Sequence, residues 1–244
     1  MPASAADRIR AHLATVDTLR HQARADGLDA AVSTVKRLQA GRFRGTYADV
    51  LSQPLQGPAA RFFLDELYGD HDFRQRDAQF GRIAAAIERV FPEAVAELSV
   101  DLAEMHALTE TLDHTMASHW LAQDPGQPVA LRYVQAWRST GRRDARERQL
   151  GVIAHMGLEL QRLTRSKSLL MMLRMMRRPA QAAGLSDLQH FLEAGFAAFA
   201  ALGDARPFLS TISQRERAWI DRLFDADLAG CVRAFDAELC VTGA

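Results

Sequence analysis

Three side chains that could bind a metal or transfer a proton lie close together on one predicted helix: His106, Glu110 and Asp113. At 3.6 residues per turn, His106 and Asp113 are about 20° apart around the helix axis, with Glu110 between them in height. They flank an apolar stripe, where imidazole and carboxylate groups could converge with ligands from a facing helix. The Glu-x-x-His pair of di-iron bundles is absent, and one helix cannot complete a coordination sphere. The favoured interpretation is a histidine at the edge of the core that is hydrogen-bonded to a neighbouring acid. A divalent metal site that also uses Glu66 is the alternative.

The second candidate is the segment Phe62–Gly69, in which aromatic and apolar residues surround two adjacent carboxylates. On a helix, the two phenylalanines, Glu66 and Tyr68 cannot all share one face. Glu66 is drawn toward the interior with its apolar neighbours, where an unpaired carboxylate would be costly. We therefore predict a half-buried or buried Glu66 paired with an arginine, either Arg76 or one from the basic half of the chain. A functional carboxylate at Glu66 is the alternative. The predicted structural lock consists of Phe62, Phe63, Asp65, Glu66, Tyr68 and Arg76.

This segment resembles the signature of the bacterial proteins named for an FFLEELY motif, with Asp65 in place of the first glutamate. The likeness is strongest from about Gln39 to Asp113 and includes the element Arg76-Asp77-x-Gln79. Short elements between Met176 and Leu185 are also similar, so the resemblance covers most of the chain. The family supplies no catalytic residues, and the resemblance therefore supports the fold and leaves the function open.

Charge is distributed unevenly along the chain. Residues 132–178 contain twelve Lys or Arg and three Asp or Glu, a net charge of +9, whereas the whole chain sums to zero. Such a segment can form an anion-binding face, or it can pack against the acidic remainder of the same fold, which we favour. The segment has few aromatic residues and no helix-turn-helix, zinc-finger or RNA-binding signature, so there is no strong nucleic-acid signal.

Within this basic segment, Ser168–Arg178 combines four methionines, three leucines and three arginines. An apolar run that covers most sides of a short helix is typical of a core helix or a subunit interface, which is the favoured interpretation. Clustered methionines also occur on adaptable surfaces that bind partner helices, and a basic amphipathic helix can rest on a membrane. The candidate partner-binding residues are Met171, Met172, Arg174, Met175, Arg177 and Arg178.

The elements that must position these residues are all predicted to be helices. Alternation with a period of two is absent, and Ala, Leu, Arg and Glu dominate the sequence. We predict an all-α, compact orthogonal or mixed bundle of about ten helices without a sheet. One helix is expected to stop before Gly41, the longest to run from Glu93 to about Gln123, and the last to begin near Thr211. Residues 1–244 are predicted to form one domain, with residues 124–128 as the point of any subdivision.

No recognisable catalytic motif is present, and no cofactor is predicted. Apolar stretches are too short to cross a bilayer, and no leader sequence is recognisable, so a cytoplasmic protein is expected. We predict a non-catalytic interaction or regulatory protein whose partner is another protein or a second copy of itself. The alternative is a helical bundle that binds a metal or cofactor through the carboxylates and histidine described above. This alternative includes an enzyme.

Overall fold

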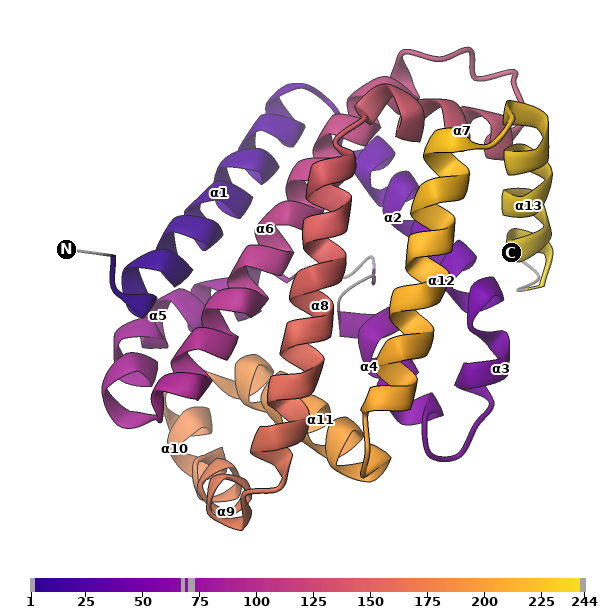
Figure 1. Cartoon of the computed structure of the whole chain (residues 1–244). Coiled ribbons are helices and arrows are strands. Elements are labelled where there is room, and N and C mark those ends of the chain that lie inside the picture. Colours follow the sequence, from indigo (N-terminus) through magenta and orange to yellow (C-terminus); the bar gives the residue numbers. More distant parts are fainter. Residues whose placement is uncertain (1–2, 67–68, 70–72, 242–244) are drawn as a thin grey trace.

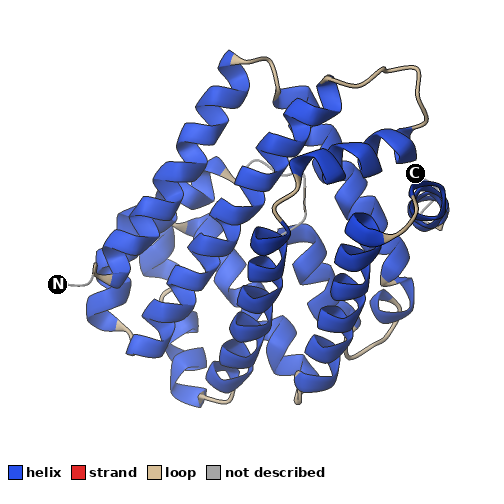
Figure 2. Ribbon diagram, turned by 45° about the horizontal axis from the view of Figure 1, so that its top comes forward, coloured by secondary structure: helices blue, strands red, loops and turns tan. Residues whose placement is uncertain are grey.

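The computed structural model describes residues 3–66, 69 and 73–241, and every regular element in these ranges is a helix (Figures 1 and 2). The helices are α1 (Ala5–Ala25), α2 (Asp29–Thr46), α3 (Ala48–Leu51), α4 (Gly57–Glu66), α5 (Arg74–Val90), α6 (Glu93–Leu121), α7 (Val129–Thr140), α8 (Arg143–Thr164), α9 (Lys167–Met175), α10 (Arg177–Ala182), α11 (Ser186–Leu202), α12 (Arg206–Asp225) and α13 (Leu228–Cys240). The all-α prediction is confirmed, because no strand occurs in the described part of the chain. In those same ranges, no helix is long and apolar enough to cross a membrane.

The long helix α6 is the central element of the bundle. It packs against α1, α2, α5, α7 and α8, and Figure 1 shows it between α1 and α8, with α12 on the other side of α8. Pro92 directly precedes its first residue, as the sequence predicted, because proline cannot donate the amide hydrogen that a helix interior requires. The helix that carries His106, Glu110 and Asp113 is therefore in contact with other helices on most of its sides.

Three apolar clusters stabilise the bundle. The first is built around Phe63, Phe199 and Phe208, the second around Tyr133 and its stacked neighbour Phe235, and the third around α1, α5 and α6. Each cluster combines residues from before and after the turn at 124–128. The turn thus reverses the chain within a shared core.

The predicted stop before Gly41 is wrong, because α2 continues to Thr46. A Cβ atom at Gly41 would lie 2.8 Å from Leu239 Cδ2, and one at Gly45 would lie 2.3 Å from the backbone oxygen of Glu238. Both glycines therefore allow α13 to cross close to α2. Their role is helix packing rather than helix termination.

The single helix predicted from about Thr211 onward is also wrong, since the chain turns at Ala226 and Asp227 between α12 and α13. The side chain of Asp227 accepts a hydrogen bond from the amide of Gly230 at 2.7 Å, which caps the new helix. This turn lets α13 fold back onto α2 and α7.

Candidate functional site

His106 lies in a buried ionic cluster formed with Arg20 and Asp77. Asp77 Oδ2 forms an ion pair with Arg20 Nη2 at 2.8 Å and lies 2.9 Å from His106 Nε2. The three side chains come from α1, α5 and α6, so the cluster joins three helices. The sequence interpretation of a histidine bonded to an acid describes this arrangement, although the acid comes from α5 rather than from α6.

The pKa of Asp77 shows how strongly its neighbours favour the ionised form. Burial raises the pKa of this carboxyl, but the hydrogen bond and charge of His106, with the charges of Arg20 and Arg76, lower it below the ordinary value overall. Asp77 is therefore an anion whose partners are all supplied by the protein.

Glu110 and Asp113 lie further along the same face of α6 and meet α2. Lys36 Nζ donates to Glu110 Oε1 at 2.6 Å, and Gln39 Nε2 donates to Asp113 Oδ1 at 2.8 Å. Burial raises the pKa of Glu110, yet the charges of Lys36 and His106 and the hydrogen bond from Lys36 lower it overall. For Asp113 burial dominates and raises the pKa, and its Oδ2 has no hydrogen-bond partner among the described residues. Glu110 therefore favours the ionised form and Asp113 the protonated form, because only Glu110 has a cation in contact among the described residues.

The predicted lock between Glu66 and an arginine is formed with Arg76. Arg76 Nη1 donates to Glu66 Oε2 at 3.1 Å, and the side chains are 12% (Arg76) and 24% (Glu66) exposed. The guanidinium also lies over the rings of Phe73 and Phe191, with its Cζ 4.0 and 4.8 Å from the ring centroids. The pair therefore joins the C-terminal end of α4 to α5 and α11.

The other members of the lock have separate environments. Phe63 is buried against Phe199 and Phe208, with ring centroids 6.0 and 5.8 Å away. Phe62 is half-buried and contacts Phe191, whereas Asp65 is exposed. Tyr68 lies outside the described residues.

The four residues of the metal alternative do not form a single ligand set. Within the described ranges, no group of three or more His, Cys, Asp or Glu side chains could hold a metal ion. Glu66 and Glu110 instead contact Arg76 and Lys36, so their negative charges are already compensated by cations. These ion pairs hold neighbouring helices together and compensate the buried charges.

A further buried ion pair, between Arg42 and Glu216, was not predicted from the sequence. Arg42 Nη2 donates to Glu216 Oε2 at 2.8 Å, and the hydroxyl of Tyr47 donates to Glu216 Oε1 at 2.9 Å. Gln39 and Arg42 follow the buried Val35 at the fourth and seventh positions, so they continue its stripe along α2. Polar residues inside an apolar stripe were the signal that could have revealed this pair.

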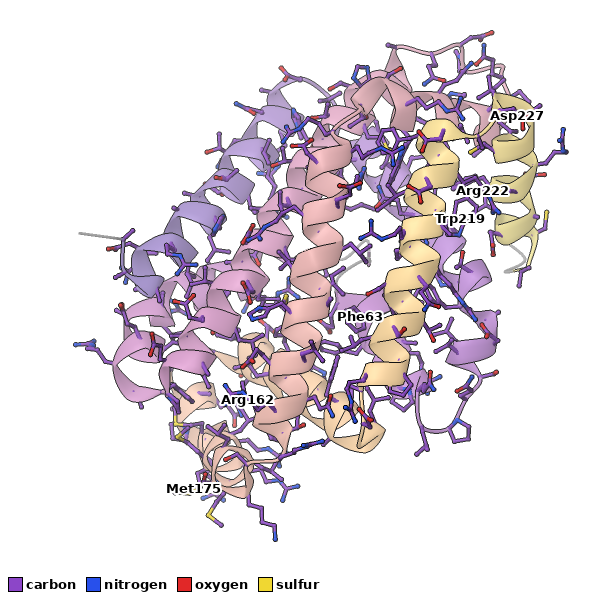
Figure 3. The ribbon with its side chains drawn as sticks, in the orientation of Figure 1. Phe63, Arg162, Met175, Trp219, Arg222 and Asp227 are labelled. Carbon is purple, nitrogen blue, oxygen red and sulfur yellow. The ribbon has the colours of Figure 1, made fainter. Side chains whose placement is uncertain are left out.

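The methionine-rich segment is not a core helix, so that part of the favoured interpretation is wrong, while a subunit interface stays a prediction. No residue of α9 is buried, and Met171 and Met175 are 65% and 71% exposed. Met172 is half-buried, while Arg174, Arg177 and Arg178 are exposed. Figure 3 shows Met175 at the periphery of the molecule. The apolar run lies on the outside because α9 is at the edge of the bundle, where its main neighbours in the described part of the chain are α8, α10 and α11.

The basic segment is neutralised in part by acids elsewhere in the fold. Arg143 pairs with Asp221 and Asp225 on α12. On α6 and α11, Glu104 and Glu193 pair with Arg148 and Arg177, respectively. All four acids lie outside residues 132–178, in the acidic remainder of the chain against which the basic segment was expected to pack.

Comparison with known proteins identifies the family of the chain. Residues 18–229, from within α1 to the start of α13, match the model of a family described as "Domain of unknown function (DUF8198)". The chain belongs to this family. A search of curated proteins and a search of solved structures found no match to this DUF8198 domain. The family match does not address the FFLEELY resemblance, which stays a prediction.

We predict that Glu66→Gln lowers the free energy of unfolding of the DUF8198 domain by about 2 kcal/mol. This value lies between those typical of exposed and fully buried ion pairs, because Glu66 is half-buried. Urea denaturation at neutral pH measures the change. The matched control is Glu97→Gln, which breaks the more exposed inter-helical pair Arg8–Glu97 and is expected to cost less than about 1 kcal/mol. Equal losses in the two variants would contradict the lock.

A second prediction concerns the pH dependence of Asp113. Since burial raises its folded-state pKa, unfolded Asp113 ionises first as the pH rises above about 4, and stability falls until the folded-state pKa is passed. Asp113→Asn cannot ionise and should therefore be more stable than the wild type at pH 7, with little difference at pH 4. Urea denaturation at both pH values tests this. A variant that is destabilised only at pH 7 would show that the folded protein needs the ionised carboxylate.

Proposed function

We propose that this DUF8198 domain is a non-catalytic interaction protein that binds an acidic, amphipathic segment of another protein. The binding surface is the α9 face, defined as Lys167, Met171, Arg174, Met175, Met176 and Arg178. The observation that carries the proposal is the exposure of Met171 and Met175 on a helix without a buried residue. Flexible, polarizable methionine side chains adapt to irregular apolar partners, such as one face of a helix.

The helix that exposes these methionines, α9, is anchored to α11. Gln189 Nε2 on α11 donates to the backbone oxygen of Leu173 at 2.7 Å, and Arg177 Nη2 contacts Glu193 Oε2 at 2.6 Å. Leu169 and Leu170 on the inner side of α9 are half-buried. The helix therefore presents its methionines while its other side is held by the fold.

Charge supports an acidic partner. Residues 160–186 contain no Asp or Glu. Lys167, Arg174 and Arg178 are exposed, and in the described ranges none of them forms an ion pair with a carboxylate. An acidic segment would be attracted to this surface before contact and would hold its register after contact.

Residue composition favours a protein partner over a lipid surface. Helices that lie in a membrane interface typically place Trp, Phe and Leu on the apolar face. The stretch 160–186 has no aromatic residue, and its most exposed apolar side chains are methionines. Methionine-rich surfaces of this kind are typical of proteins that bind amphipathic helices.

A photo-crosslinking amino acid at position 175 in the full chain, expressed in its native cells, identifies the occupant. The expected product is an adduct to one protein, through a segment that contains both acidic and apolar residues. The same amino acid at Val90, an apolar residue on α5 that is 67% exposed, is the matched control and should not give this adduct. Adducts to lipid, to a second copy of the chain, or equally from both positions would overturn the proposal.

We predict that Met175→Asp weakens binding of the crosslinked segment, prepared as a peptide, by roughly 10- to 100-fold. The estimate follows from losing about 1.5–3 kcal/mol for one buried methionine side chain, and an added negative charge opposes an acidic partner. Titration calorimetry with the purified domain measures the affinity. Val90→Asp makes the same chemical change on α5 and should leave the affinity unchanged. An unchanged affinity in Met175→Asp would contradict the proposed surface.

A further inference from the structure

An apolar cavity of about 110 Å³ lies between α4, α6, α8 and α11, apart from the α9 face. Its walls carry five aromatic rings, those of Phe62, Phe63, Phe191, Phe196 and Phe199. The two phenylalanines of the signature segment therefore take part in one cavity. The remaining walls are aliphatic, apart from Ser99 and two glycines.

The cavity offers almost nothing to a polar occupant. Among the described residues of its lining, Ser99 supplies the only polar side chain, and that hydroxyl donates to the backbone oxygen of Val95 at 2.8 Å. An ordered water would need two to four polar partners, which the described lining does not supply. An empty apolar cavity destabilises a protein in proportion to its volume, so an apolar occupant would be favoured.

Glycine at position 195 shapes one wall. A Cβ atom there would lie 2.8 Å from Phe62 Cζ, so glycine allows the Phe62 ring to approach α11. In this position the ring contacts Phe191, with centroids 5.5 Å apart, and meets Phe63 nearly edge-on, at 6.4 Å and 75°. These ring contacts fix the aromatic walls and leave the central space open.

Part of the cavity lining is accessible to solvent. Leu192 on α11 is 39% exposed, and Met156 and Leu160 on α8 are half-buried. These side chains are aliphatic and flexible, and they belong to the part of the lining that α8 and α11 supply. A small molecule can enter there without unfolding a helix.

We propose that this cavity binds an uncharged aromatic ring, either a small molecule or the apolar end of a larger one. Size supports a single ring, because an engineered apolar cavity of about 150 Å³ binds benzene. Chemistry supports an aromatic one, because phenylalanine rings attract another ring through offset and edge-to-face contacts. No charged side chain lines the cavity in the part of the chain that the structure describes, which favours a neutral group.

Toluene is the probe that tests this proposal, and binding to the full chain is followed by thermal unfolding and by NMR. We expect saturating toluene to raise the melting temperature and to shift the amide signals of Gly157 and Gly195, which line the cavity. Leu160→Phe fills the cavity and should weaken toluene binding at least tenfold. The matched control is Leu158→Phe on the same helix, where the side chain is exposed and does not line the cavity; it should bind toluene like the wild type.

The possible outcomes separate clearly. Tight toluene binding that is lost only in Leu160→Phe supports the proposal. No binding to the wild type, or equal binding to both variants, would overturn the site. Tighter binding of cyclohexane than of toluene would overturn the aromatic class of ligand. None of these outcomes depends on a protein bound at the α9 face.

Discussion

The constraint on which the rest of the structure depends is the need to compensate the charges that α6 carries into the interior. An uncompensated buried charge costs several kcal/mol, a large part of the roughly 5–15 kcal/mol by which a domain is stable. Lys36 on α2 meets this need at Glu110, and Asp77 on α5, which also pairs with Arg20 on α1, binds His106. The same contacts fix the positions of three helices around α6. His106 and Glu110, whose side chains could bind a metal, thus hold neighbouring helices against α6.

Much of the fold could be predicted from the sequence because helix formation is largely local. The absence of strand periodicity predicted an all-helical fold, and the predicted start of the longest helix at Glu93 is the observed start of α6. The failures at Gly41 and Asp227 have one physical cause. A glycine ends a helix or admits a neighbouring helix, and an aspartate caps a helix or lies on its surface, according to the tertiary contacts that surround it. Gly41 meets α13, which lies almost two hundred residues further along the chain.

The candidate sites could also be predicted from the sequence only where the interacting residues are close together in the chain. Glu66 and Arg76 are ten residues apart, and their pairing follows from local burial. Lys36 and Glu110 are 74 residues apart and Arg42 and Glu216 are 174 apart, so a single sequence does not indicate which cation meets which acid. The position of α9 was missed for another reason. A short helix that is apolar on most sides has the same pattern in a core and on a partner-binding surface, and only packing distinguishes them.

A double-mutant cycle on Lys36 and Glu110 tests most directly whether the charges of α6 are compensated by the protein. Lys36→Met and Glu110→Gln each leave one buried charge without its partner, and each should lower the free energy of unfolding at pH 7 by about 3–5 kcal/mol. The double variant has no charge at either position and should lose much less than the sum of the two single changes. Single losses below about 1 kcal/mol that simply add would contradict the account, because Glu110 would then not depend on Lys36.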